Sequence, residues 1–165
     1  MAKPTVSVLF VCMGNICRSP TGEGVFQHYV EQNGYADQFD IDSAGTIAYH
    51  SGEPADARMR DVASNRGYQL LSRARKVTEQ DLKSFDLVVA MDTDNLVEME
   101  AMVDGPKQHI RLLGTFLEGY QNNDDAPSVP DPYYGGTASF EKVLDMIESA
   151  CPIMMTHCLE ILNHK

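Results

Sequence analysis

Short apolar runs rich in β-branched residues recur along the chain, and turn residues bound each of them. Runs of this length and composition predict buried strands. They occur at Val6–Val11, Phe39–Ser43, Phe85–Ala90 and His109–Leu112. The chain is therefore expected to build a central sheet of four strands.

Helical spacing of apolar residues fills the intervals between these runs. Helices are predicted at about 18–33, at about 55–66, after Thr78, after Asp92 and at about 137–162. Gly34 and Gly67 are suitable stops for the first two helices. Thr78 begins a sequence typical of a capping box, and Asp92 can cap the N–H groups around Asn95.

The last third of the chain holds a loop and a long helix. Residues 122–136 are rich in Pro, Gly and Asp and predict a loop, and Pro152 should kink the helix that follows. Alternating strands and helices are typical of a parallel sheet covered on both faces. We therefore expect residues 1–165 to form a single three-layer α/β/α domain that binds its ligand at the carboxyl ends of the strands.

Composition and charge narrow the class of protein. The chain has 165 residues and a formal net charge of −11, which argues against nucleic acid or an anionic membrane surface as a partner. The first apolar run is too short to cross a bilayer, and no secretory signal is present. Four cysteines in a chain of this size do not indicate a disulfide framework. We expect a cytoplasmic protein that is not inserted in a membrane.

The first strand runs directly into a loop that begins with Cys12 and ends at Arg18. At such a strand-to-helix junction, unpaired backbone N–H groups and the helix dipole favour an anion. Gly14 allows close approach of the backbone, and Asn15 tolerates a left-handed conformation. The guanidinium of Arg18 matches two phosphate oxygens. The loop therefore predicts a phosphate site.

A thiol at Cys12 would lie among these donors, which would stabilise its thiolate. The same donors would hold the equatorial oxygens of a phosphoryl group under in-line attack. The spacing of Cys12 and Arg18 alone is a weak signal, and a structural cysteine at a strand end is the alternative. The preceding strand and the following Ser19 and Pro20, which suit a helix start, favour a nucleophile.

Hydrolysis of a phosphate ester also needs a proton donor, because a phenolate leaves poorly without one. Asp131 is the best candidate, since Pro130 and Pro132 stiffen the backbone on both sides of it. Tyr133 and Tyr134 offer flat walls for an aromatic substrate. Taken alone, Asp-Pro is ordinary turn chemistry, but beside a phosphate-binding loop it indicates a general acid.

With these motifs in place, the chain resembles the low molecular weight protein-tyrosine phosphatases over nearly its whole length. The matching segments are Val11–Pro20, Asp42–Thr46, Ala74-Arg75, Ala90–Asn95 and Asp131–Gly136. The first and last of these are together highly specific. The segment Tyr49–Asp56 looks more like bacterial members than animal ones.

The resemblance implies a two-step hydrolysis of phosphotyrosine and aryl phosphate monoesters that needs no cofactor and no metal. Cys12 would attack phosphorus to form a phosphocysteine, while Arg18 and the loop amides hold the phosphate. Asp131 would protonate the leaving group and then activate water. Ser19 would donate to the sulfur, and Asn15 would brace the loop.

The resemblance also implies which residues surround the substrate. They belong either to the loop or to the walls of the aromatic pocket. The implied substrate-binding residues are Met13, Gly14, Asn15, Ile16, Cys17, Ser19, Tyr49, Tyr133 and Tyr134.

Two positions raise separate questions. Many family members carry a histidine that supports the loop asparagine, where this chain has Ser72. A hydroxyl is shorter and cannot become a cation, so water or another side chain would have to support the loop. Cys17 is close enough in sequence to trap an oxidised Cys12 as a disulfide; the alternative is that Cys17 only packs behind the loop.

Two other functions stay open. Thioredoxin-coupled arsenate reductases share the loop but add a cysteine pair after the third strand, where residues 91–98 contain no cysteine. A non-catalytic phosphoprotein-binding module would be expected to lack Cys12 or Asp131. For partners, the resemblance suggests a phosphotyrosine protein, with a bacterial tyrosine kinase of polysaccharide export as one example. No nucleic acid is expected, and the chain would be a monomer or a weak dimer.

Overall fold

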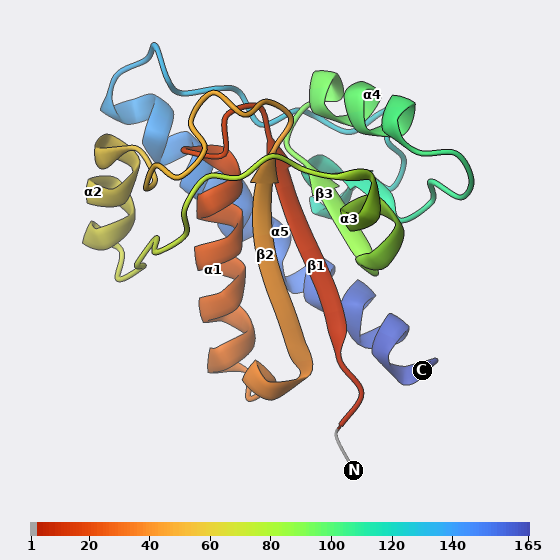
Figure 1. The fold of residues 1–165 in the computed structure, drawn as a ribbon. Coiled ribbons are helices and arrows are strands. Elements are labelled where there is room, and N and C mark those ends of the chain that lie inside the picture. The colour runs from red at the N-terminus through yellow and green to blue at the C-terminus, as the bar shows by residue number, and fades with distance from the viewer. Residues whose placement is uncertain (1–2) are drawn as a thin grey trace.

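The computed structural model describes residues 3–165, and a sheet of four parallel strands lies at its centre (Figure 1). The strand order is β2-β1-β3-β4. The strands are β1 (Val6–Cys12), β2 (Phe39–Gly45), β3 (Leu87–Ala90) and β4 (Ile110–Leu112). The predicted parallel sheet is confirmed; β3 begins two residues later than predicted because Phe85 ends the preceding helix.

Helices occupy all five predicted intervals, and two short 3₁₀ turns are added. The elements are α1 (Arg18–Gln32), η1 (Ala36–Gln38), α2 (Ala57–Asn65), α3 (Glu79–Ser84), α4 (Thr93–Met102), η2 (Leu113–Phe116) and α5 (Thr137–Asn163). The caps predicted at Thr78 and Asp92 form, but Ser19 does not cap α1, because this helix already begins at Arg18 after Cys17. Thr78 and Asp81 make a reciprocal capping box on α3, and Asp92 and Asn95 make another on α4.

The helices cover the two faces of the sheet and complete three layers. Val8 and Phe10 of β1 pack with α1 and α5 on one face, whereas Leu9 and Val11 pack with α3 and α4 on the other. This alternation follows from the two-residue period of a strand that is buried on both sides. It places Cys12 at the end of β1 among the residues that pack on the α1 and α5 face.

α1 lies against β1 at the position of Gly22. A Cβ atom there would come within 2.6 Å of the Phe10 ring, so only glycine permits this approach. Phe10 also makes an edge-to-face contact with Phe26, with ring centroids 5.9 Å apart. Full burial of such a ring contributes about 2–3 kcal/mol. The start of α1, which carries the predicted phosphate loop, is therefore held firmly against the sheet.

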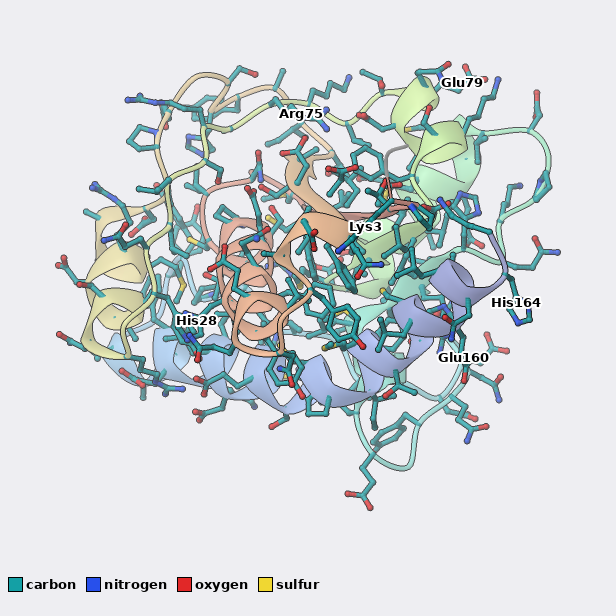
Figure 2. All side chains as sticks on the ribbon, turned by 90° about the horizontal axis from the view of Figure 1, so that it is seen from below. Lys3, His28, Arg75, Glu79, Glu160 and His164 are labelled. Carbon is teal, nitrogen blue, oxygen red and sulfur yellow. The ribbon has the colours of Figure 1, made fainter. Side chains whose placement is uncertain are left out.

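α5 is the longest helix, with 27 residues, and Pro152 lies inside it. The helix continues through this proline, and the predicted kink stays a prediction. Seen from below, α5 runs along the side of the molecule with Glu160 and His164 near one end (Figure 2). In the part of the chain that the structure describes, no helix is long and apolar enough to cross a membrane.

The loops that follow the strands meet at one end of the sheet (Figure 1). These are the segment 12–18 after β1, the segment after β2 and the predicted loop at 122–136, which contains neither helix nor strand. The start of β1 and the C-terminal end of α5, in contrast, lie toward the opposite end of the sheet. The carboxyl ends of the strands thus carry the expected ligand site.

Candidate active site

A cavity of about 320 Å³ opens at the carboxyl end of β1. Three segments that are far apart in the sequence line it: the loop after β1, the segment after β2 and the loop before α5. The lining residues are Cys12, Met13, Gly14, Ile16, Cys17, Arg18, Ile47, Tyr49, His50, Asp131, Tyr133 and Tyr134. Cys12 and Arg18 lie at the buried end, each 3% exposed.

Backbone hydrogen bonds tie the loop to the chain that follows β2. Thr46 N donates to Cys12 O at 2.9 Å, and Ile47 N donates to Met13 O at 3.1 Å. This close approach requires glycine at the end of β2, since a Cβ on Gly45 would lie 2.7 Å from Met13 O. The start of the loop is therefore anchored by two backbone hydrogen bonds before any side chain is considered.

Asn15 has the left-handed backbone conformation, with a φ of 57°. A non-glycine residue adopts this conformation at some cost, which local hydrogen bonds offset. Its Nδ2 donates to Ser19 Oγ at 2.7 Å and to Ser43 Oγ at 3.0 Å, and its Oδ1 accepts from Arg75 N at 3.0 Å. Ser72 is not among these partners, so Ser43 and the Arg75 backbone support the asparagine.

Ser19 lies beside the sulfur of Cys12, with 3.0 Å between Oγ and Sγ. The Ser19 oxygen already accepts from Asn15, so its own hydrogen is left for another acceptor. The two acceptors within reach are Cys12 Sγ and, at 3.3 Å, Ala44 O. This geometry suits a hydroxyl that stabilises a thiolate. Asn15 and Ser19 lie behind the cavity and do not line it.

Arg18 is fixed on one side of its guanidinium. Nη1 donates to Asp92 Oδ2 at 2.5 Å and to Val129 O at 3.0 Å. Burial alone would lower the pKa of Arg18, but the electrostatic interaction with Cys12 and the hydrogen bond to Asp92 outweigh it, so the pKa is raised. The guanidinium is therefore a permanent cation at the end of the cavity that Cys12 also lines.

Asp131 lies at the cavity mouth, and its side chain is 40% exposed. Its Oδ2 is 3.7 Å from Nη2 of Arg18, and its Oδ1 accepts from Tyr133 N at 3.1 Å. A carboxyl group in this position is within reach of both the phosphate end of a substrate and solvent. Geometry of this kind suits proton transfer to a leaving group.

The cavity walls are aromatic and largely exposed. Tyr133 and Tyr134 make an edge-to-face pair with centroids 5.0 Å apart. Tyr134 is 96% exposed and Tyr49 is 83% exposed, so these rings are available to a ligand. The cavity thus combines a charged, buried end with open aromatic sides.

Three functional neighbours were not recognised from the sequence. Asp92 was predicted as a helix cap at the carboxyl ends of the strands, where the ligand binds, but its pairing with Arg18 was not predicted. Ile47 and His50 line the cavity, and a Cβ on Gly14 would lie 3.1 Å from the His50 ring. The position of Asp92 directly after β3, beside β1 in the sheet, was a signal for its pairing with Arg18; no such signal marked Ile47 or His50.

Cys17 and Cys12 are both buried free thiols that line the cavity. Burial raises the pKa of Cys17, and the nearby charges of Asp56 and Cys12 raise it further. Cys17 is therefore a protonated thiol at neutral pH. Of the two cysteines, only Cys12 has Ser19 as a hydroxyl partner.

Known proteins resemble this chain over most of its length. The model of the family described as low molecular weight phosphotyrosine protein phosphatase matches residues 7–164. A low molecular weight protein-tyrosine-phosphatase of Streptomyces coelicolor is 40% identical over 148 residues, which cover 88% of this chain and 89% of that protein.

Solved structures give the same result. A protein tyrosine phosphatase from Entamoeba histolytica, with Hepes in its active site, superposes with a TM-score of 0.87 at 40% identity, covering 94% of this chain and 98% of that one. A Drosophila arginine phosphatase superposes with a TM-score of 0.80 at 31% identity, covering 91% of this chain and 96% of that one.

Proposed function

Because the chain belongs to the low molecular weight phosphotyrosine protein phosphatase family, we propose that it hydrolyses phosphotyrosine and aryl phosphate monoesters through a phosphocysteine on Cys12. The protein is a phosphoric monoester hydrolase of this family. The observation that carries the proposed mechanism is the group of Cys12, Ser19 and Arg18 at the buried end of an aromatic-walled cavity. Asp131 lies at its mouth.

In the first step, the thiolate of Cys12 attacks phosphorus while the bond from phosphorus to the phenolic oxygen breaks. The carboxyl proton of Asp131 passes to that oxygen, so the substrate leaves as a neutral tyrosine. Arg18 and the loop N–H groups bind the equatorial oxygens, whose charge they stabilise during the transfer. The product of this step is a phosphocysteine on Cys12.

In the second step, water attacks the phosphocysteine. The carboxylate of Asp131 takes a proton from this water, the bond from sulfur to phosphorus breaks, and inorganic phosphate is released. The electron pair returns to the sulfur of Cys12, and the Ser19 hydroxyl donates to it. A hydrogen bond to the departing thiolate makes it a better leaving group, which is the role we assign to Ser19.

The substrate class follows from the cavity walls. Ile16, Tyr49, Tyr133 and Tyr134 present apolar and aromatic surface, which suits the ring of phosphotyrosine. The similarity to an arginine phosphatase makes phosphoarginine the competing substrate. Within residues 3–165, Asp131 is the one carboxylate among the cavity lining. The proposed catalysis already uses it, so the cavity wall offers no second carboxylate to a guanidinium.

For the biological setting, phosphoproteins are the substrates of this family, and we propose a phosphotyrosine protein in the cytoplasm. A bacterial tyrosine kinase of polysaccharide export remains a partner that only the family resemblance suggests. We also propose that residues 1–165 act as a single domain, as a monomer or a weak dimer.

The deciding experiment assays the wild type and Cys12→Ser at pH 4.5 to 8. The four substrates are a phosphotyrosine peptide, an aryl phosphate, phosphoarginine and, with thioredoxin, arsenate. We expect hydrolysis of a phosphotyrosine peptide and an aryl phosphate, much slower hydrolysis of phosphoarginine, and none in Cys12→Ser. Reduction of arsenate with thioredoxin would instead support the arsenate reductase. Tight binding of the phosphotyrosine peptide without turnover by the wild type would support a binding module.

A further inference from the structure

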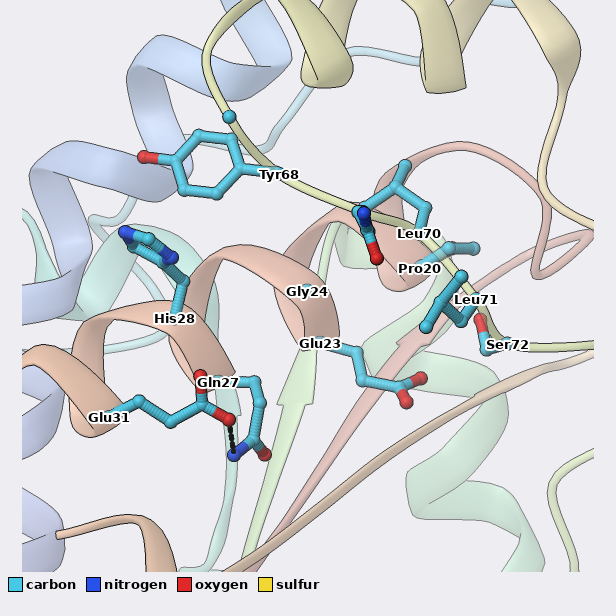
Figure 3. Close-up of a pocket in the computed structure, with 12 residues that line it drawn as sticks. Pro20, Glu23, Gly24, Gln27, His28, Glu31, Tyr68, Leu70, Leu71 and Ser72 are labelled. Carbon is cyan, nitrogen blue, oxygen red and sulfur yellow. Dashed lines mark hydrogen bonds between the residues drawn. The ribbon is translucent and has the colours of Figure 1, made fainter.

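Glu23 is a partly buried carboxylate on α1, one helical turn after Ser19, and the proposed reaction does not use it. It borders a second cavity of about 390 Å³ between α1 and residues 67–72. Figure 3 shows its carboxylate pointing toward the segment that carries Ser72. Its Oε1 accepts a hydrogen bond from Ser43 Oγ at 2.6 Å.

Through Ser43, this carboxylate is connected to the nucleophile. Ser43 Oγ is 3.0 Å from Asn15 Nδ2, Asn15 Nδ2 is 2.7 Å from Ser19 Oγ, and Ser19 Oγ is 3.0 Å from Cys12 Sγ. Each link is within ordinary hydrogen-bond distance. Asn15, Ser19 and Ser43 are all at most 1% exposed, so bulk water cannot readily replace any of these contacts.

The direction of each hydrogen bond follows from the donors available. The amide of Asn15 has two N–H bonds, and it gives one to Ser19 and one to Ser43. Both hydroxyl oxygens therefore accept from Asn15, and each hydroxyl hydrogen must go to another acceptor. The Ser43 hydrogen goes to Glu23, and the Ser19 hydrogen is left to Cys12 or to Ala44 O.

We propose that Glu23 is a positioning residue for the nucleophile. Its ionised carboxylate can only accept a hydrogen bond, so it fixes the direction of the Ser43 hydroxyl. Through Asn15, this keeps the Ser19 hydrogen on the sulfur of Cys12. The inference rests on the proposed function of Cys12. Without this acceptor, the hydroxyl hydrogen of Ser43 can turn toward the side-chain N–H of Asn15. Two hydrogens would then face each other, and the hydrogen bond from Asn15 to Ser43 would be lost. The asparagine would then lose one of the contacts that hold its left-handed backbone.

The surroundings of Glu23 make its charge sensitive to pH. Burial raises the pKa of Glu23, and the hydrogen bond from Ser43 opposes this. Of the charged groups on neighbouring elements, Asp42 on β2 raises the pKa and Arg75 lowers it, while His28 and Glu31 of α1 border the same cavity. A protonated Glu23 could donate to Ser43 and reverse the chain of hydrogen bonds, so nucleophile support should fail on acidification.

The same cavity offers a matched control. Glu31 also lies on α1 and borders the cavity, but its carboxylate accepts from Gln27 at 2.9 Å and has no link to the loop (Figure 3). Glu31→Gln therefore changes the charge of the cavity by the same amount as Glu23→Gln. Only the second substitution alters the acceptor of Ser43.

The test measures kcat, KM and the pH profile for an aryl phosphate in Glu23→Gln, Glu23→Leu and Glu31→Gln. Loss of one acceptor should lower kcat in Glu23→Leu by about tenfold, with KM nearly unchanged. The kcat of Glu23→Gln, which keeps a neutral acceptor, should lie between those of Glu23→Leu and the wild type. The acid side of its pH profile should no longer show the ionisation of Glu23. Glu31→Gln should match the wild type.

The rate of alkylation of Cys12 by iodoacetate, measured against pH, tests the inference without turnover. The pH midpoint of this reaction should rise in Glu23→Leu and stay unchanged in Glu31→Gln. Reduced thermal stability with an unaltered midpoint and kcat would give Glu23 a purely structural role and overturn the inference. A second outcome is that the alkylation of Cys12 in the wild type and the variants follows the expected pattern while the wild type hydrolyses no substrate. That result would overturn the proposed function and leave the positioning role standing.

Discussion

Arg18 and Asp92 form an ion pair, with 2.5 Å between Nη1 and Oδ2, across the carboxyl ends of the neighbouring strands β1 and β3. The same carboxylate caps α4, since Oδ1 of Asp92 accepts from Asn95 N at 2.8 Å. One side chain thus fixes both the phosphate-binding arginine and the start of a helix. The two roles can be separated by mutation.

Asp92→Asn should lower kcat/KM for aryl phosphates by about tenfold to a hundredfold, because a charge-assisted hydrogen bond of about 1.5–3 kcal/mol is lost from Arg18. Asparagine is itself a good helix cap, so the thermal stability should change little. Steady-state kinetics and thermal unfolding of the same samples measure the two effects.

The control for this prediction is Asn95→Ala, which removes the other half of the capping box. It should lower the free energy of unfolding by about 1 kcal/mol and leave kcat/KM unchanged. If Asp92→Asn retained full activity, the pairing with Asp92 would have no part in holding Arg18.

The sequence determines much of this site through local rules. The apolar run of β1, the left-handed tendency of Asn15 and the cap at Asp92 each depend on a few adjacent residues, and local physics predicts them. The pairing of Arg18 with Asp92 and the contact of Ser43 with Glu23 join residues 74 and 20 positions apart. Such contacts depend on how the elements pack, which no local pattern encodes.

His50 and Ile47 illustrate the same limit of local patterns. They line the cavity because the backbone after β2 folds over the loop, where Ile47 N donates to Met13 O. The support of Asn15 by Ser43 likewise could not be predicted from the serine at position 72. A short side chain there indicated that other groups must act, but it did not identify them.

Asp81 gives the protein a stability that should depend on pH. Burial alone would raise the pKa of Asp81, but the hydrogen bonds from Arg75 and the Thr78 backbone outweigh it and lower the pKa below the ordinary value of 3.8. A lowered pKa means that the ionised carboxylate favours folding. This contribution is present above the ordinary value and is lost as the pH falls through the lower, folded-state value.

Asp81→Asn should therefore destabilise the protein by about 1–2 kcal/mol at pH 7, where the hydrogen bonds to a charged carboxylate are lost. The difference from the wild type should shrink below pH 3.8, the ordinary aspartate value. Urea unfolding at several pH values measures it. A difference that stayed constant with pH would show that the charge of Asp81 is not the source of the stability.

The role of Asp131 as general acid predicts a dependence on the leaving group. A phenolate of low basicity departs with little help, whereas the phenolate of tyrosine needs a proton. Asp131→Asn should therefore lower kcat by about a hundredfold or more for phosphotyrosine and by a smaller factor for an aryl phosphate with an acidic phenol. Equal losses for both substrates would instead indicate a role in binding or in the second step.

Cys17 predicts how the enzyme responds to peroxide. Hydrogen peroxide would oxidise the thiolate of Cys12 to a sulfenic acid and be reduced to water. The sulfur of Cys17 would then attack it, forming a disulfide and releasing a second water. Burial raises the pKa of Cys17, so this trapping should be faster at pH 8 than at pH 6.

Activity lost to peroxide should therefore return in the wild type when dithiothreitol is added, but not in Cys17→Ser, whose sulfenic acid proceeds to the irreversible sulfinic acid. Cys151→Ser is the matched control, because Cys151 is also buried but lies on α5 and does not line the cavity. Mass spectrometry after oxidation identifies the product on Cys12. If Cys17→Ser recovered as fully as the wild type and Cys151→Ser, Cys17 would only pack behind the loop.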